Sequence, residues 1–101
     1  MKTYYSDYVG RAARYYFNNP DITNFPDDIN ERNWKAVRDS LEEFALSDRQ
    51  IIKSVLYGSS LVSLKENVIA TQLLFNVSQS YVYKVLSDFE KAVARKCKLI
   101  V

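Results

Sequence analysis

The sequence predicts a single all-α domain, residues 1–101, of about five helices that ends in a helix-turn-helix with a long second helix. Only two glycines and two prolines occur among the 101 residues, so few positions interrupt a helix. Hydrophobic residues make up 48% of the chain, and they recur at the spacings of three and four that mark one face of a helix. A chain of this length can bury one core. We expect residues 1–57 to form a helical support and residues 64–98 to form the helix-turn-helix part.

The first helix is expected over residues 4–17. Its buried stripe is formed by Tyr5, Tyr8, Val9, Ala12 and Tyr16. The Asn-Asn-Pro sequence at 18–20 ends the helix, because proline has no backbone N–H and disfavours a helical residue before it. Residues 19–29 then form a loop, which Ile22 and Phe25 attach to the core.

Two more helices are expected in the middle of the chain. Asn30 caps a helix that runs to about Ala45 and buries Trp34, Val37, Leu41 and Phe44. Ser47 and Gln50 have the spacing of a capping box, which predicts a third helix with Ile51, Ile52, Val55 and Leu56 inward. Gly-Ser-Ser at 58–60 ends that helix, and residues 61–64 are either extended or a packed loop.

Residues 67–86 predict the helix-turn-helix itself. Asn67 can cap the first helix by accepting a hydrogen bond from the opening turn. The corner is formed by Phe75-Asn76-Val77, since asparagine tolerates the left-handed backbone that ends a helix, and valine attaches the turn to the core. Ser78 caps the second helix, which continues to about residue 97 and is roughly 30 Å long. The buried stripe of this helix is Val82, Val85, Leu86 and Phe89.

A polar face remains exposed at the start of the second helix, where a helix-turn-helix presents side chains to base edges in the major groove. The candidate DNA-contacting residues are Ser78, Gln79, Ser80, Tyr83 and Lys84, with Lys65 from the preceding helix. Glutamine can pair with adenine, and lysine can bind guanine or phosphate. The same residues also fit an ordinary solvated face. For Tyr83, contact with DNA and packing on a neighbouring helix fit equally well, whereas Tyr81 is expected to be partly packed.

The corner Phe75-Asn76-Val77-Ser78, the buried residues Val82 and Val85, and the basic run Lys91-Ala92-Val93-Ala94-Arg95-Lys96 resemble the fourth conserved region of principal-type bacterial sigma factors. The whole chain is similar to short sigma-like proteins of Firmicute phages and integrative mobile elements, which share a Tyr-rich first helix, an Asn-Pro break and a Trp-bearing second helix. This resemblance implies double-stranded DNA and RNA polymerase as partners. Sigma recognition helices carry several arginines where this chain has Gln79, Ser80, Tyr81 and Tyr83.

Charge is distributed unevenly along the chain. Residues 1–48 hold six Lys or Arg and nine Asp or Glu, a net charge of −3, whereas residues 49–101 hold eight and three, a net charge of +5. A basic half that contains the helix-turn-helix suits a polyanion. The cations Lys91, Arg95, Lys96 and Lys98 have two interpretations, because they also offset the dipole at the end of a helix.

Enzyme and metal chemistry find little support in the composition. Histidine is absent, and the single cysteine, Cys97, is expected to pack in the core. Two glycines leave no Gly-rich phosphate loop. We therefore expect no catalytic residue, no cofactor and no metal site. No apolar run approaches the roughly 20 residues of a membrane span, and no signal-peptide core begins the sequence, so we expect a cytoplasmic protein.

The function expected from these features is sequence-specific DNA binding by a sigma-like transcription factor that acts with RNA polymerase or with a second copy of itself. The alternative is a small phage or mobile-element module for protein–protein interaction, in which the helix-turn-helix is only structural. In that alternative a tyrosine surface binds the partner. It is formed by Tyr4, Tyr5, Tyr8, Tyr15 and Tyr16. A local core around Trp34 is the other explanation for these tyrosines.

Overall fold

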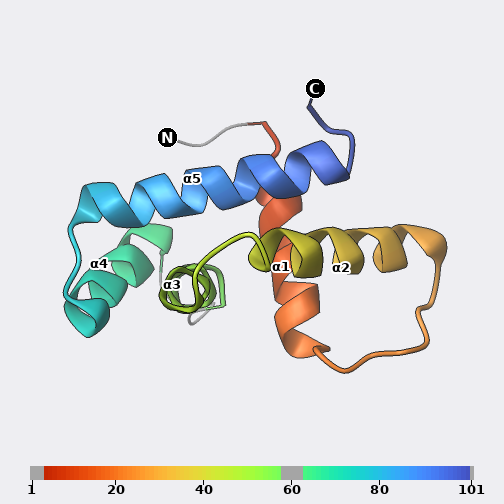
Figure 1. The fold of residues 1–101 in the computed structure, drawn as a ribbon, viewed down its shortest axis with the longest axis horizontal. Helices are drawn as coiled ribbons and strands as arrows, with labels where there is room; N and C mark the ends of the chain where they lie inside the picture. The colour runs from red at the N-terminus through yellow and green to blue at the C-terminus, as the bar shows by residue number, and fades with distance from the viewer. Residues whose placement is uncertain (1–3, 58–62, 101) are drawn as a thin grey trace.

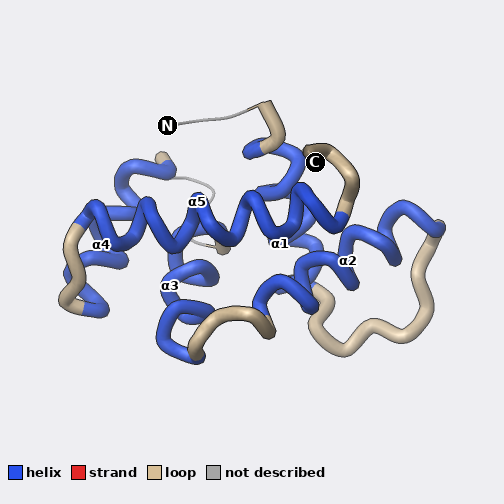
Figure 2. The backbone as a smooth tube through the Cα atoms, turned by 45° about the horizontal axis from the view of Figure 1, so that its top comes forward, coloured by secondary structure: helices blue, strands red, loops and turns tan. Residues whose placement is uncertain are grey.

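The structure is a computed structural model that describes residues 4–57 and 63–100. This part of the chain is all-α (Figures 1 and 2). Its five helices are α1 (Ser6–Asn18), α2 (Asp28–Leu41), α3 (Leu46–Leu56), α4 (Leu64–Phe75) and α5 (Gln79–Lys96). The predicted fold class and number of helices are confirmed for the described residues, which contain no strand.

Helix α5 is the longest element and packs on the other four helices. Figure 1 shows it along the long axis of the molecule, with α4, α3, α1 and α2 following one another beneath it. The predicted stripe of α5 is buried and continues into its C-terminal half. The core residues that are at most 1% exposed come from all five helices: Val9, Ala13, Val37, Ile52, Val55, Val68, Val82, Phe89, Val93 and Ala94.

The loop between α1 and α2 is held by Trp34. The Trp34 ring lies 5.1 Å from the Tyr16 ring and 5.6 Å from the Phe25 ring, measured between centroids. Its indole N–H donates a 2.8 Å hydrogen bond to the backbone oxygen of Asn19. Phe25 therefore attaches the loop to the core, as the sequence predicts.

The predicted limits of the second helix are wrong at both ends. Asp27 caps α2, since its Oδ1 accepts a 2.7 Å hydrogen bond from the backbone N–H of Asn30. Asn30 therefore lies within the first turn. The helix ends at Leu41 instead of Ala45, because the N–H groups of Glu43 and Phe44 bond three residues back, to Ser40 and Leu41, and tighten the chain into turns. These turns direct the ring of Phe44 onto that of Phe89, 6.3 Å away.

Two other predicted caps are also wrong. Helix α3 begins at Leu46 without a side-chain cap, so Ser47 and Gln50 form no capping box. Arg49 instead donates from Nε to the backbone oxygen of Phe44 at 2.8 Å. Helix α4 begins at Leu64, and the Ser63 hydroxyl accepts from the N–H of Glu66 at 3.2 Å.

Asn67, the predicted cap of α4, lies inside that helix. Its side chain donates a 3.4 Å hydrogen bond to the backbone oxygen of Val55 on α3. For residues 61–64 the sequence predicts either an extended segment or a packed loop. Leu64 is instead the first residue of α4. The predicted stop at 58–60 and residues 61–62 lie outside the described residues.

The N-terminal tyrosines serve mainly the interior of the protein. Tyr5 is buried, and Tyr8, Tyr15 and Tyr16 are half-buried. The Tyr8 hydroxyl donates to Asn33 Oδ1 at 3.0 Å. Tyr4 is 80% exposed, but its hydroxyl donates to the backbone oxygen of Leu99 at 2.9 Å. Tyr16 packs on Trp34, and Tyr4 alone of these five tyrosines is exposed, so they do not form a continuous exposed surface.

Candidate nucleic-acid interface

The connection between α4 and α5 has the predicted geometry. Asn76 adopts the left-handed conformation, with φ of 54°, and its backbone N–H bonds to the oxygen of Gln72. Val77 is half-buried and packs against the core. This corner changes the direction of the chain in three residues, and it places the start of α5 next to the end of α4 (Figure 1).

The first turn of α5 is capped as predicted. The Ser78 oxygen accepts a 3.1 Å hydrogen bond from the backbone N–H of Tyr81. No acidic residue occupies this first turn. The partial positive charge of the helix N-terminus is therefore not offset by a carboxylate of its own first turn.

Three of the candidate contact residues, Gln79, Ser80 and Lys84, are exposed in the first two turns of α5. The Lys84 ammonium lies 3.1 Å from Asp88 Oδ2, and the two side chains are 72% and 48% exposed. Such a pair contributes little to stability, and its lysine can exchange partners. Tyr83 is half-buried and packs against the core, but it also borders the groove described next.

A groove of about 850 Å³ is lined by residues of α1 and α5. Ser80, Tyr83 and Lys84 line it from α5, together with Lys91 about two turns beyond Lys84. Arg14 lines it from α1. Sequence reasoning missed Arg14: its place off the buried stripe shows that it is exposed, but no local pattern shows that α1 crosses α5.

Lys65 is exposed in the first turn of α4, and it is not among the residues that line this groove. The structure thus brings Ser80, Tyr83 and Lys84 together around one hollow and does not bring Lys65 to it. Ser78 remains at the corner as a helix cap, and Gln79 is on the exposed first turn of α5.

Two carboxyl groups face the cations in the groove. Glu90 Oε1 accepts a 3.3 Å hydrogen bond from the Ser6 hydroxyl, and Asp7 lines the same groove. Burial raises the pKa of the Glu90 carboxyl, the bond from Ser6 lowers it in part, and Asp7 raises it again. The groove therefore holds three cations, Arg14, Lys84 and Lys91, against two carboxyls, one of which has a raised pKa.

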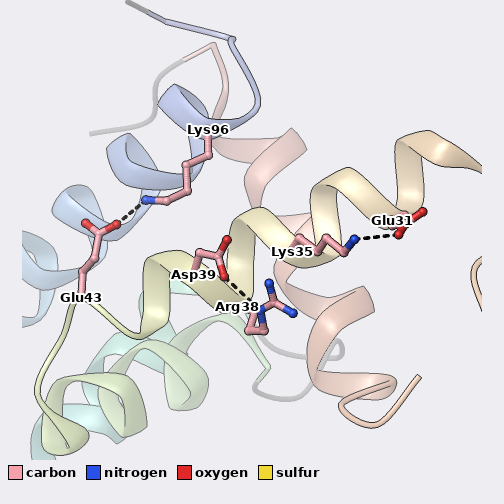
Figure 3. A network of polar contacts seen from close by, with 6 residues as sticks. All are labelled: Glu31, Lys35, Arg38, Asp39, Glu43 and Lys96. Carbon is pink, nitrogen blue, oxygen red and sulfur yellow. Dashed lines mark hydrogen bonds and ion pairs between the residues drawn. The ribbon is translucent and has the colours of Figure 1, made fainter. Parts of the chain in front are cut away.

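The basic run at the end of α5 is divided between two roles. Lys96 forms an ion pair with Glu43 in the connection between α2 and α3, and Figure 3 shows its side chain directed there. Arg95 and Lys98 are exposed, and Lys91 lines the groove. Lys96 therefore contacts the connection between α2 and α3, whereas no ion pair of the described residues engages the other three cations.

Other chemistry is limited in the described residues. Cys97 is buried, as predicted, and burial raises the pKa of its thiol, with a smaller opposing effect from Arg32. Within residues 4–57 and 63–100, no group of three or more His, Cys, Asp or Glu side chains is placed to hold a metal ion. None of the described helices has both the length and the hydrophobicity of a membrane span. No family model, curated protein or solved structure matches this chain.

Proposed function

We propose that the protein is a sequence-specific DNA-binding transcription factor of the sigma-like type, in which α4 and α5 act as a helix-turn-helix. The observation that supports this proposal is the exposed polar start of α5, where Gln79, Ser80 and Lys84 follow a short capped turn. In this function the first turns of α5 enter the major groove of duplex DNA. RNA polymerase is included as a partner because of the sigma-like resemblance.

The residues on this face suit base and phosphate contacts. The Gln79 amide can donate to N7 and accept from N6 of adenine, and the Lys84 ammonium can donate to guanine or to a phosphate. Lys84 must leave Asp88 to do so, which costs at most about 1 kcal/mol for an exposed pair. Base contacts of this kind specify a sequence, since each good pair discriminates by about 1–3 kcal/mol.

Cations around the groove supply phosphate contacts in the same proposal. Arg14 and Lys91 line the groove beside Lys84, and Lys65 is an exposed cation in the first turn of α4. Phosphate contacts position the protein but carry no sequence information. They make the affinity depend on salt.

A second candidate function, a protein–protein interaction module, is favoured by a different observation. The outer side of α4 exposes Leu73 and Leu74 at 80% and 72%. Among the described residues, Leu73 and Leu74 are more exposed than Tyr5, Tyr8, Tyr15 and Tyr16, so the outer side of α4 suits a protein partner better than those tyrosines do. The two functions are compatible, because Leu73 and Leu74 lie on α4, whereas the proposed base-contacting residues lie on α5.

Two pairs of variants test the DNA-binding proposal. Gln79→Ala and Lys84→Ala remove candidate contacts. Gln50→Ala and Lys35→Ala are matched controls: Gln50 is exposed on α3, and Lys35 forms an i,i+4 pair with Glu31, as Lys84 does with Asp88. The ligand is a duplex selected from a random-sequence library with the wild-type protein, and the measurement is the Kd by fluorescence anisotropy.

We expect Gln79→Ala to raise the Kd for the selected duplex by about 5- to 100-fold, and the Gln50→Ala control to leave it unchanged. Lys84→Ala should raise the Kd relative to Lys35→Ala. Circular dichroism and thermal melting should show that all four variants remain folded. Failure to select any duplex, or equal losses in candidate and control variants, would contradict the proposal.

A further inference from the structure

The groove between α1 and α5 has an apolar floor. Leu56 and Leu86 line it and are each 5% exposed, so they lie at its bottom. Tyr83, which is half-buried, and Leu64, which is 48% exposed, line it as well. Small-molecule sites have volumes of about 300–1,000 Å³ and are mostly apolar with a few polar groups. At about 850 Å³, this groove has the size and the floor of such a site.

Gly10 leaves space in the groove on the α1 side. It lies inside that helix, where glycine is less favourable than alanine, and it lines the groove. The three atoms nearest to a Cβ added at Gly10 belong to the Arg14 guanidinium, at 3.7 to 4.0 Å. These are ordinary contact distances, so close packing does not require a glycine here. The missing side chain therefore enlarges the groove, and the guanidinium of Arg14 lies beside the space that it leaves.

The two helices that line the groove meet at one end of it. The Ser6 hydroxyl of α1 donates to Glu90 Oε1 of α5 at 3.3 Å, and Figure 1 shows α1 running steeply away from α5. At about 1.5 Å per residue, Arg14 lies about 12 Å from this contact along α1, and Lys84 lies about 9 Å from it along α5. Arg14 and Lys84 therefore belong to two different walls of the groove.

Cations on both walls can bind an anion. Arg14 and Lys91 form no hydrogen bond or ion pair within residues 4–57 and 63–100. Lys84 pairs with Asp88 in an exposed contact, which it can exchange for another partner. The Arg14 guanidinium presents its donors as a planar fork, which matches the two oxygens of a carboxylate.

Two carboxyl groups of the protein limit the charge of the ligand. Asp7 and Glu90 both line the groove, and the bond from Ser6 places Glu90 at the end where α1 and α5 meet. Like charges close together are destabilising, so these carboxyls oppose a ligand that spreads several negative charges through the groove. A single charge beside Arg14 avoids this repulsion. Polyphosphates are therefore disfavoured relative to a monoanion.

We propose that this groove is a binding site for a small organic monoanion, a carboxylate with an aromatic or aliphatic body. The body packs on Leu56, Leu86 and the ring of Tyr83. The carboxylate accepts from the Arg14 guanidinium, with the Lys84 ammonium on the opposite wall. Both parts of the ligand contribute, because the floor is apolar and the cations lie on the walls.

An NMR titration of the isotope-labelled full chain with indoleacetate tests this proposal. The signals that should shift and saturate are the backbone amides of Gly10, Tyr83 and Leu86 and the side-chain N–H of Arg14. For a ligand of this size we expect a Kd of about 0.1–1 mM. Indoleacetamide has nearly the same shape without the charge, and acetate has the charge without the apolar body. Both should bind at least about tenfold more weakly, because each lacks one of the two contributions.

Two variants separate the charge from the space. Arg14→Gln should raise the Kd for indoleacetate about tenfold. Arg11→Gln is its matched control, since Arg11 is exposed on α1 but does not line the groove, and it should leave the Kd unchanged. Gly10→Leu keeps the net charge but places a side chain in the groove, so it should abolish binding. Circular dichroism should show that all three variants remain folded.

Three results would overturn the proposal: no saturable shift of the groove signals up to about 10 mM indoleacetate, equal affinity for indoleacetamide, or equal losses in Arg11→Gln and Arg14→Gln. Pyrophosphate that binds more tightly than indoleacetate would overturn the class of ligand. Duplex DNA would share Ser80, Tyr83 and Lys84 with this ligand, so the titration contains no DNA. Failure here is therefore distinct from failure of the proposed function.

Discussion

The hydroxyl of Tyr81 donates a 2.6 Å hydrogen bond to Asp48 Oδ1, which connects the first turn of α5 to the first turn of α3. Tyr81 is 40% exposed and is not among the residues packed against the core, so it is held by this hydrogen bond and not by the expected packing of its ring. The contact engages Tyr81 with the supporting helices and leaves Gln79, Ser80 and Lys84 as the polar groups of that turn. It also orients α5 relative to α3 at the end that we propose enters DNA.

This contact predicts a specific dependence on pH. The hydrogen bond to Asp48 raises the pKa of Tyr81 above its usual value of 10.0, with smaller contributions from burial and from the Asp48 charge. Because the folded pKa exceeds the unfolded one, the stabilisation is complete below pH 10 and is lost as the pH rises through the raised pKa.

The Asp48→Asn variant should return the Tyr81 pKa toward 10.0. The measurement is an NMR titration of tyrosine ring carbons, with Tyr81 assigned by a Tyr81→Phe variant. The Asp28→Asn variant serves as a control, because Asp28 is an exposed first-turn residue of α2. An unchanged Tyr81 titration in Asp48→Asn would show that the hydrogen bond is absent in solution.

The left-handed backbone of Asn76 predicts how substitutions there change the stability of the protein. A residue with a Cβ in the left-handed region is disfavoured by about 1–2 kcal/mol, and asparagine is less affected than alanine. Asn76→Ala should therefore lower the free energy of unfolding by about 1 kcal/mol, whereas Asn76→Gly should leave it unchanged or raise it. Urea denaturation followed by circular dichroism measures both. Equal effects of alanine and glycine would contradict a left-handed Asn76.

The side chains that join α3 to α4 form a polar contact in the core. Thr71 is fully buried and its hydroxyl donates to the backbone oxygen of Asn67 at 2.7 Å. The Ser54 oxygen lies 2.6 Å from the Thr71 oxygen. Since the only hydroxyl proton of Thr71 is already used, Ser54 is the donor in this pair.

Thr71→Val should lower the free energy of unfolding by about 1–2 kcal/mol, because the Ser54 hydroxyl loses its acceptor in a half-buried place. Ser54→Ala should have a smaller effect. The double variant should lose less than the sum of the two single variants, by about 0.5–1 kcal/mol. Strict additivity in this cycle, measured by urea denaturation, would contradict the contact.

The groove cations give a prediction about DNA affinity. Arg14→Gln and Lys91→Gln should each weaken binding to all duplexes by a similar factor and reduce the salt slope by about 1. Arg11→Gln is the control for α1, since Arg11 is exposed on the same helix but does not line the groove. A change in sequence preference in place of a uniform loss would contradict a phosphate role for Arg14 and Lys91.

The parts of the fold that the sequence predicts depend on contacts within four residues. The left-handed turn at Asn76 and the cap at Ser78 are such cases, because each satisfies backbone groups of its own turn. The N-caps of α2 and α4 are Asp27 and Ser63, whereas the sequence predicts Asn30 and Asn67. Each region has several residues that can cap within four positions, and capping propensities do not distinguish them.

The remaining differences depend on contacts between distant residues. The packing of Phe44 on Phe89 ends α2 early and changes how the chain enters α3, and these two residues are far apart in the sequence. Arg14 joins the candidate interface only because α1 crosses α5. No hydrophobic period or charge run within either helix contains that information.

The most direct test of DNA binding through α5 is a salt titration of the wild-type protein with a labelled mixed-sequence duplex, followed by fluorescence anisotropy. Three surface cations, Arg14, Lys84 and Lys91, line the groove at the proposed contact face, and a fourth, Lys65, is exposed in the first turn of α4. If they bind phosphates, the affinity should fall with a log–log salt slope of about −3 to −4. No binding at the lowest salt, or an affinity that does not change with salt, would contradict DNA binding by this face.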